Sequence, residues 1–128
     1  MRINCIYTGK ELSIDQFDLD HFMPWSFVSH DLLWNLIPSD PSINSSKSNK
    51  IPNLDFYLQK LALTHQTALK IAFETSRRNK LLEDYLSLGA TPEEIITMIQ
   101  SQLYNCFRNT FSPMVQIATN MGLKRGIM

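Results

Sequence analysis

The sequence contains no apolar run that approaches the roughly 20 residues needed to cross a bilayer, and its first 18 residues hold no continuous apolar segment of signal-peptide length. We therefore expect a cytoplasmic protein without a membrane partner. Cysteine is also scarce: Cys5 and Cys106 stand at opposite ends of the chain and form neither a CxxC pair nor a disulfide framework. Two unpaired, reduced thiols are expected.

The chain also has a formal net charge of zero at pH 7, because its 12 basic and 12 acidic residues balance. Their distribution is uneven: residues 1–46 hold two basic and six acidic residues, a net charge of −4, whereas residues 47–80 hold seven basic and two acidic, a net charge of +5. An acidic segment that could hold a cation, followed by a basic one that could meet phosphates, suits a metal-dependent nuclease. Solvated helix faces would give the same sums, and charge alone favours that simpler interpretation.

The chain has 128 residues, of which 44% are hydrophobic and 19% charged, as expected for one compact globular domain. Its character changes near residue 53. Before this point, short apolar stretches alternate with Gly, Pro, Ser and Asn, which predicts brief strands and loops. After it, helical periodicity dominates, so the predicted class is α+β.

Apolar residues at three- and four-residue steps predict a long amphipathic helix whose apolar face includes His65, which we expect to be a core histidine. Gly89 is expected to stop a second helix. Thr91 can cap a third, and Pro113 is expected to begin a last short one. The expected helices are residues 54–75, 77–88, 92–108 and 114–121.

A shorter helix is predicted earlier, in the stretch "SDPSINSSKSN". Ser39 or Asp40 can cap its first turn and Pro41 can occupy its first position, giving about two turns. The helix is expected to run through Ser48, and Asn44, Lys47 and Ser48 then share one of its faces. The expected order is strand, long loop, strand, short helix and helical tail.

Asp20 and His21 are neighbours with complementary chemistry. An aspartate is a hard oxygen ligand suited to Mg²⁺, and a histidine of near-neutral pKa can accept a proton from water. Neighbours on an ideal strand point to opposite faces, so both serve one site only where the strand ends, twists or bulges. Pro24 predicts such an ending, because proline leaves the sheet ladder.

The spacing of two asparagines after this pair makes it a more specific sign of a nuclease site. Asn35 follows His21 by 14 residues and Asn44 follows Asn35 by nine. The series resembles the HNH endonuclease motif, most closely the HNH domains of RNA-guided CRISPR nucleases and related restriction and defence nucleases. "HFMPWSF" is similar to the family's run after its histidine, and "CIYTGKEL" to its opening knuckle without the second cysteine. The resemblance covers about residues 3–52.

The resemblance implies a ββα-metal core in residues 1–52, with residues 53–128 as a helical extension packed on it in a single compact domain. Asp20 and Asn44 would bind Mg²⁺ or Mn²⁺, and His21 would be the general base that activates water. Asn35 would hold the loop and thereby orient His21. Lys47 would contact the scissile or adjacent phosphate, and a solvated helix lysine is an equally weighted alternative.

Other residues are weaker candidates. Ser48 and Asn49 are rivals of Asn44, which the spacing favours. His30 is expected at the surface of the loop, and Trp25 and Trp34 under the hairpin. The knuckle retains Cys5 alone, so no structural zinc is expected.

The function implied is hydrolysis of DNA phosphodiester bonds to 5′-phosphate and 3′-hydroxyl ends, in bacterial restriction or phage defence. RNA fits the same chemistry and stays open as the substrate. The main alternative is a catalytically inactive binding module for nucleic acid or protein that keeps the fold and presents its helical part to a partner.

Overall fold

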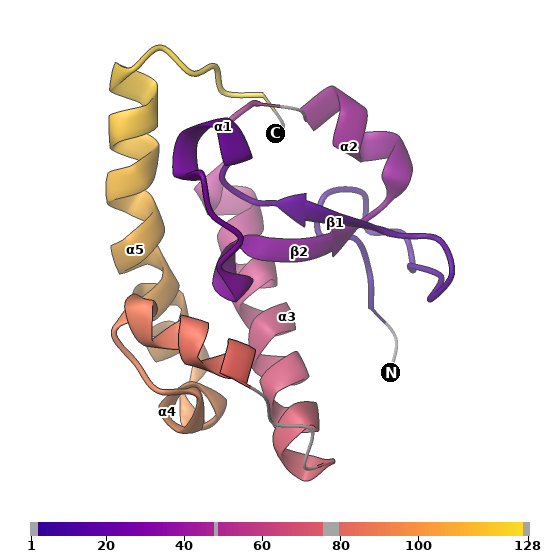
Figure 1. Ribbon diagram of the computed structural model, residues 1–128, viewed down its shortest axis with the longest axis vertical. Helices are drawn as coiled ribbons and strands as arrows, with labels where there is room; N and C mark the ends of the chain where they lie inside the picture. Colours follow the sequence, from indigo (N-terminus) through magenta and orange to yellow (C-terminus); the bar gives the residue numbers. More distant parts are fainter. Residues whose placement is uncertain (1–2, 48, 76–79, 127–128) are drawn as a thin grey trace.

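The computed structural model of the chain describes residues 3–47, 49–75 and 80–126, and for residues 44–46, 80 and 81 it describes the backbone alone. A two-stranded hairpin comes first and helices follow, which confirms the predicted α+β class. Figure 1 shows the hairpin lying across one end of the long helix α3 (Leu54–Glu74), while α5 (Gln100–Asn120) runs beside α3. The hairpin thus rests on helices from the later part of the chain.

The hairpin pairs β1 (Asp18–His21) with β2 (Leu36–Ser39) in antiparallel register. Directly opposed residues of such a pair point to the same face, and the register sets Asp20 opposite Ile37. Both are buried, at 6% and 1% exposure. Asp20 therefore lies on the inner face of the hairpin, and His21 is the last residue of its strand.

The loop between the strands contains a single helical turn, α1 (Trp25–Val28), and a 3-10 turn, η1 (Leu33–Asn35). Trp34 is buried in η1, and its indole N–H donates to Oγ of Ser87 at 2.7 Å. Trp25 is 54% exposed, so the prediction that it packs under the hairpin is wrong. The turn α1 directs this side chain to solvent, and Trp34 supplies the packing instead.

The short helix α2 (Pro41–Lys47) forms directly after β2, as predicted. Asp40 caps it, because its Oδ1 accepts a hydrogen bond from the backbone N–H of Ser42 at 3.0 Å. Pro41 occupies the first helical position, where its missing N–H costs nothing. The cap and the proline thus fix where the helix begins and how far along it Lys47 lies.

The long helix α3 confirms the prediction for residues 54–75, and Asn53 caps it by accepting from the N–H of Asp55 at 3.0 Å. The second predicted helix is a 3-10 helix, η2 (Lys80–Leu88), and its first predicted residues, 77–79, lie outside the described residues. Gly89 follows with a φ of +88°, a conformation that favours glycine and ends the helix.

One long helix over residues 92–108 is a wrong prediction. Thr91 and Glu94 form the capping box that begins α4 (Pro92–Thr97), as its sequence indicates, but α4 ends there and α5 begins at Gln100. At this break the amide of the buried Gln66 side chain donates to the carbonyls of Ile95 and Met98, both at 2.9 Å. Met98 and Ile99 have extended backbone, with ψ of 137° and 164°, so the helical hydrogen-bond pattern stops between α4 and α5.

The separate last helix over residues 114–121 is also wrong, because α5 continues through Pro113 to Asn120. A proline inside a helix costs about 3 kcal/mol. Here α5 buries Leu103, Phe107 and Phe111 on one side, and this burial outweighs the cost. Among the described residues, no helix is long and apolar enough to cross a membrane.

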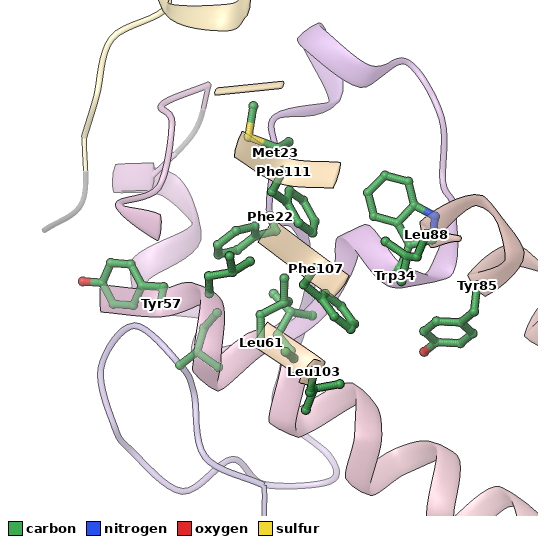
Figure 2. Close-up of a cluster of buried hydrophobic side chains, with 14 of the residues drawn as sticks. Phe22, Met23, Trp34, Tyr57, Leu61, Tyr85, Leu88, Leu103, Phe107 and Phe111 are labelled. Atoms are coloured by element: carbon green, nitrogen blue, oxygen red, sulfur yellow. The ribbon is translucent and has the colours of Figure 1, made fainter. Parts of the chain in front are cut away.

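The core lies between the hairpin, α3 and α5 (Figure 2). Phe111 of α5 meets Phe22 and Trp34 edge-to-face, with ring centroids 5.2 and 5.3 Å apart. Buried leucines of α3, Leu58 and Leu61, complete this part of the cluster. Phe22, which follows β1, and Trp34, which precedes β2, are therefore both packed on α5. This packing positions the end of β1.

Candidate active site at the end of strand β1

The carboxylate of Asp20 receives two donors from different parts of the chain. The hydroxyl of Tyr7, in the N-terminal turn, donates to Oδ2 at 3.0 Å. The ammonium of Lys47, the last residue of α2, lies 3.4 Å from the same oxygen. The side chains of Asp20 and Lys47 are only 7% and 1% exposed, so the contact is a buried ion pair.

Burial dominates the electrostatics of this cluster. It raises the pKa of the Asp20 carboxyl, and the Lys47 ammonium and the Tyr7 hydroxyl offset only part of that effect. Burial also lowers the pKa of Lys47, which Asp20 partly offsets. Burial and then the Asp20 charge raise the pKa of Tyr7, so its hydroxyl stays a donor. Asp20 is thus a buried carboxylate held by one ammonium and one hydroxyl.

Lys47 is fully buried, so the alternative of a solvated helix lysine is wrong. Its Nζ also donates to the backbone carbonyl of His21 at 2.6 Å. One ammonium group thus contacts both the Asp20 side chain and the His21 backbone, and it ties α2 to the end of β1. The predicted contact between Lys47 and a phosphate stays a prediction.

His21 is half-buried and has a partner in the loop: its Nε2 lies 2.7 Å from Oδ1 of Asp31. The Asp31 side chain is 73% exposed. A carboxylate on one ring nitrogen fixes the ring's orientation and leaves the other nitrogen for chemistry. Sequence reasoning missed Asp31, since an acidic loop residue ten positions after a histidine carries no recognisable signal.

Asn35 is fully buried and bridges the chain just after β1. Its side-chain oxygen accepts from the N–H of Met23 at 2.8 Å, and its amide donates to the carbonyl of Met23 at 3.0 Å. Its own carbonyl accepts from the N–H of Phe22 at 2.7 Å. These contacts support the predicted role of Asn35 in holding the segment that follows His21, although the effect on His21 itself stays a prediction.

Asn44, the second predicted metal ligand, belongs to α2 one turn before Lys47, and its side chain lies outside what the structure describes. Its rival Asn49 is exposed, and Ser48 lies outside the described residues. The described part of the chain brings no three His, Cys, Asp or Glu side chains together around a possible metal position. The residue types nevertheless fit Mg²⁺, because the carboxylate oxygen of Asp20 and the amide oxygen of Asn44 suit this ion, which keeps several waters.

The other two histidines, His65 and His30, have hydrogen-bond partners within the protein. His65 is a core histidine, as predicted, and its Nδ1 pairs with the Tyr85 hydroxyl at 2.6 Å. His30 is half-buried rather than a free surface residue: its Nδ1 accepts from the N–H of Leu32 at 3.2 Å. Cys5 and Cys106 are both free thiols, as expected.

Two comparisons with known proteins found similarity, and both cover at least part of the site region. Residues 5–53 match the family model of HNH endonucleases. A curated relative, the CRISPR-associated endonuclease Cas9 of Streptococcus mutans, is 29% identical over an alignment of 101 residues that covers 77% of this chain. The aligned region spans only 7% of that relative's length. No solved structure matches the chain. The expected resemblance is confirmed.

Proposed function

We propose that the chain is a metal-dependent endonuclease that hydrolyses DNA phosphodiester bonds. The match of residues 5–53 to the HNH endonuclease family model and the similarity to a Cas9 endonuclease support this proposal. The observation that carries this proposal is the buried carboxylate of Asp20, directly followed by His21 at the end of a strand. A cation ligand and a base at adjacent positions are what phosphodiester hydrolysis requires.

His21 is the proposed general base. With Asp31 on Nε2, its Nδ1 is the nitrogen that takes a proton from the attacking water. The hydroxyl oxygen forms a bond to phosphorus, and the bond from phosphorus to the 3′ oxygen breaks. Solvent then supplies a proton to the 3′ oxygen, so the products are a 5′-phosphate and a 3′-hydroxyl. Asn35 keeps the segment after His21 in place during this step.

Asp20 and Asn44 are the proposed ligands of Mg²⁺ or Mn²⁺. When bound, such an ion neutralises negative charge that develops on the scissile phosphate. Lys47 is the proposed phosphate contact: an ammonium has three N–H groups, and two of them meet Asp20 and the His21 carbonyl. The Lys47 side chain is only 1% exposed, so this contact requires a movement that uncovers Nζ when the nucleic acid binds.

The biological setting follows from the relative's name, a CRISPR-associated endonuclease. We infer a cytoplasmic role in bacterial restriction or phage defence. Target choice then depends on a partner, and residues 53–128 offer a helical surface for one. RNA is the alternative substrate for the same chemistry.

The test is cleavage of supercoiled plasmid and of single-stranded DNA and RNA with Mg²⁺ or Mn²⁺, comparing wild type with His21→Ala. His30→Ala is the matched control, because it removes the other histidine of this region. The proposal expects cation-dependent cutting by wild type and the control, and none by His21→Ala. Equal cutting by all three would show that His21 is not the base.

A non-cutting binding module is the second candidate, and one observation favours it: Asp20 and His21 are both already paired, with Lys47 and Asp31. Such a module would bind nucleic acid without cutting it under any of these conditions. Binding measured by gel shift in the presence of cation, with no products, would therefore replace the first proposal.

A further inference from the structure

We propose that Tyr7 is a positioning residue of the cation site. Its hydroxyl holds Oδ2 of Asp20, so that Oδ1 is the oxygen presented to the cation. This inference rests on the proposed function, in which Asp20 is a cation ligand. It adds a residue from the N-terminal turn to a site otherwise built from β1 and α2.

The geometry at the carboxylate supports this assignment. Among the side chains that the structure describes, both donors to Asp20 meet the same oxygen: the Tyr7 hydroxyl at 3.0 Å and the Lys47 ammonium at 3.4 Å. Two donors on one oxygen fix the rotation of a carboxylate about its last bond. The second oxygen is then held in one direction, which is what a metal ligand needs in order to bind without loss of side-chain freedom.

The position of the Tyr7 hydroxyl is itself set by packing. The ring meets Tyr57 of α3 edge-on, with centroids 5.2 Å apart at 66°. On its face lies the Lys47 ammonium, 5.9 Å from the ring centroid. Backbone hydrogen bonds between Cys5 and Lys10, at 2.8 Å, and between Gly9 and Cys5, at 2.9 Å, close the turn that carries the ring.

Tyr7 therefore differs from a residue that merely fills space. Its ring contributes packing, and its hydroxyl contributes the contact to Asp20. A single substitution can therefore test the hydroxyl while the ring stays in place. Tyr7→Phe removes the hydroxyl and keeps the ring. Tyr85→Phe is the matched control. It also removes the hydroxyl of a tyrosine that is held in the protein, because Tyr85 is buried and its hydroxyl pairs with His65. Figure 2 places Tyr85 on the opposite side of the core from Tyr57, the neighbour of Tyr7.

The experiment measures Mn²⁺ affinity without substrate, from the electron paramagnetic resonance signal of free Mn²⁺. Loss of a group that orients a metal ligand typically weakens binding about tenfold or more, and we expect this for Tyr7→Phe. Tyr85→Phe should bind Mn²⁺ as wild type does, even though it unfolds at a lower temperature. Asp20→Ala sets the level of binding that does not involve the site.

The outcomes separate this inference from the proposed function. If wild type binds Mn²⁺ through Asp20 and Tyr7→Phe binds it equally well, Tyr7 has no positioning role and the proposed function stands. If wild type binds no more Mn²⁺ than Asp20→Ala, the cation site itself is wrong and the role of Tyr7 with it. Equal weakening of Mn²⁺ binding in Tyr7→Phe and Tyr85→Phe would show that Tyr7 has only a structural role.

A second measurement does not depend on the folding of a variant. In wild-type protein with ¹³C at the tyrosine ring carbon that bears the hydroxyl, Mg²⁺ should shift the Tyr7 signal and leave that of Tyr85 in place. The hydrogen bond to Oδ2 changes when the carboxylate takes up a cation. An unmoved Tyr7 signal at saturating Mg²⁺ would overturn the inference.

Discussion

The Nζ of Lys47 lies 3.4 Å from Oδ2 of Asp20, and both side chains are buried beneath the end of the hairpin. A buried pair of this kind holds its structure in place, because removal of one partner leaves the other charge without compensation. It also puts a resident positive charge beside the proposed cation ligand. Lys47 therefore stabilises the site and repels the ion that the site is proposed to bind.

Replacing Lys47 with Met should separate these two effects. Without cation, the free energy of unfolding should fall by roughly 3 kcal/mol, since a buried carboxylate loses its partner. The gain in melting temperature on adding Mn²⁺ should be larger than in wild type, because repulsion is removed. Lys60→Met, at an exposed position of α3, is the control and should change neither quantity. An unchanged or smaller Mn²⁺ gain in Lys47→Met would contradict this account.

Asp31→Asn should slow cutting without changing stability. The substitution removes the charge that fixes the His21 ring, and we expect a roughly tenfold lower rate, a part of the 10²- to 10⁴-fold that a general base contributes. Plasmid cleavage under single-turnover conditions gives the rate. Asp15→Asn makes the same charge change at another exposed position and should cut normally. Full activity of Asp31→Asn would mean that the 2.7 Å contact plays no part in catalysis.

Acid should destabilise the protein through His65. Burial lowers the pKa of His65 from 6.5 to about 4, so the unfolded chain binds a proton more readily than the folded one. The stabilisation is complete above pH 6.5 and is lost as the pH falls from 6.5 toward 4. It amounts to roughly 3 kcal/mol. Urea unfolding of wild type and His65→Leu across this range gives the difference, which should shrink as the pH falls. A constant difference would exclude this role.

Phe111→Ala should destabilise the hairpin and the helices together. Phe111 is fully buried against Phe22 and Trp34, and loss of such a ring costs roughly 3–5 kcal/mol. Tryptophan fluorescence and far-ultraviolet circular dichroism should follow one urea transition if residues 1–52 and 53–128 fold as a single domain. Phe56→Ala, at a 59% exposed position, is the control. Two separate transitions would instead divide the chain into two folding units.

Local chemistry made much of the site predictable. Pro41 and the Asp40 cap place α2 and therefore Lys47, and Pro24 predicts where β1 ends beside His21. The chemistry of neighbouring Asp20 and His21 made them candidates, and the spacing to Asn35 and Asn44, which resembles that of HNH endonucleases, made the pair specific. These features depend on a few neighbouring residues, so a sequence reveals them.

Long-range contacts were not predictable in the same way. The burial of Lys47, the contact of Tyr7 with Asp20, and the pairing of Asp31 with His21 depend on how separate segments approach one another. Similarly, the helix predicted after Thr91 breaks where Gln66, from another part of the fold, donates to two of its carbonyls. Local propensity also failed at Pro113, where tertiary packing of α5 decides the structure.

The most direct test of the central claim is the cation dependence of plasmid cutting by Asp20→Asn and His21→Ala, each compared with wild type. If Asp20 binds the cation and His21 is the base, excess Mn²⁺ should restore part of the cutting to Asp20→Asn and none to His21→Ala. The opposite pattern, or wild-type cutting by His21→Ala at any Mn²⁺ concentration, would contradict the assignment of this site.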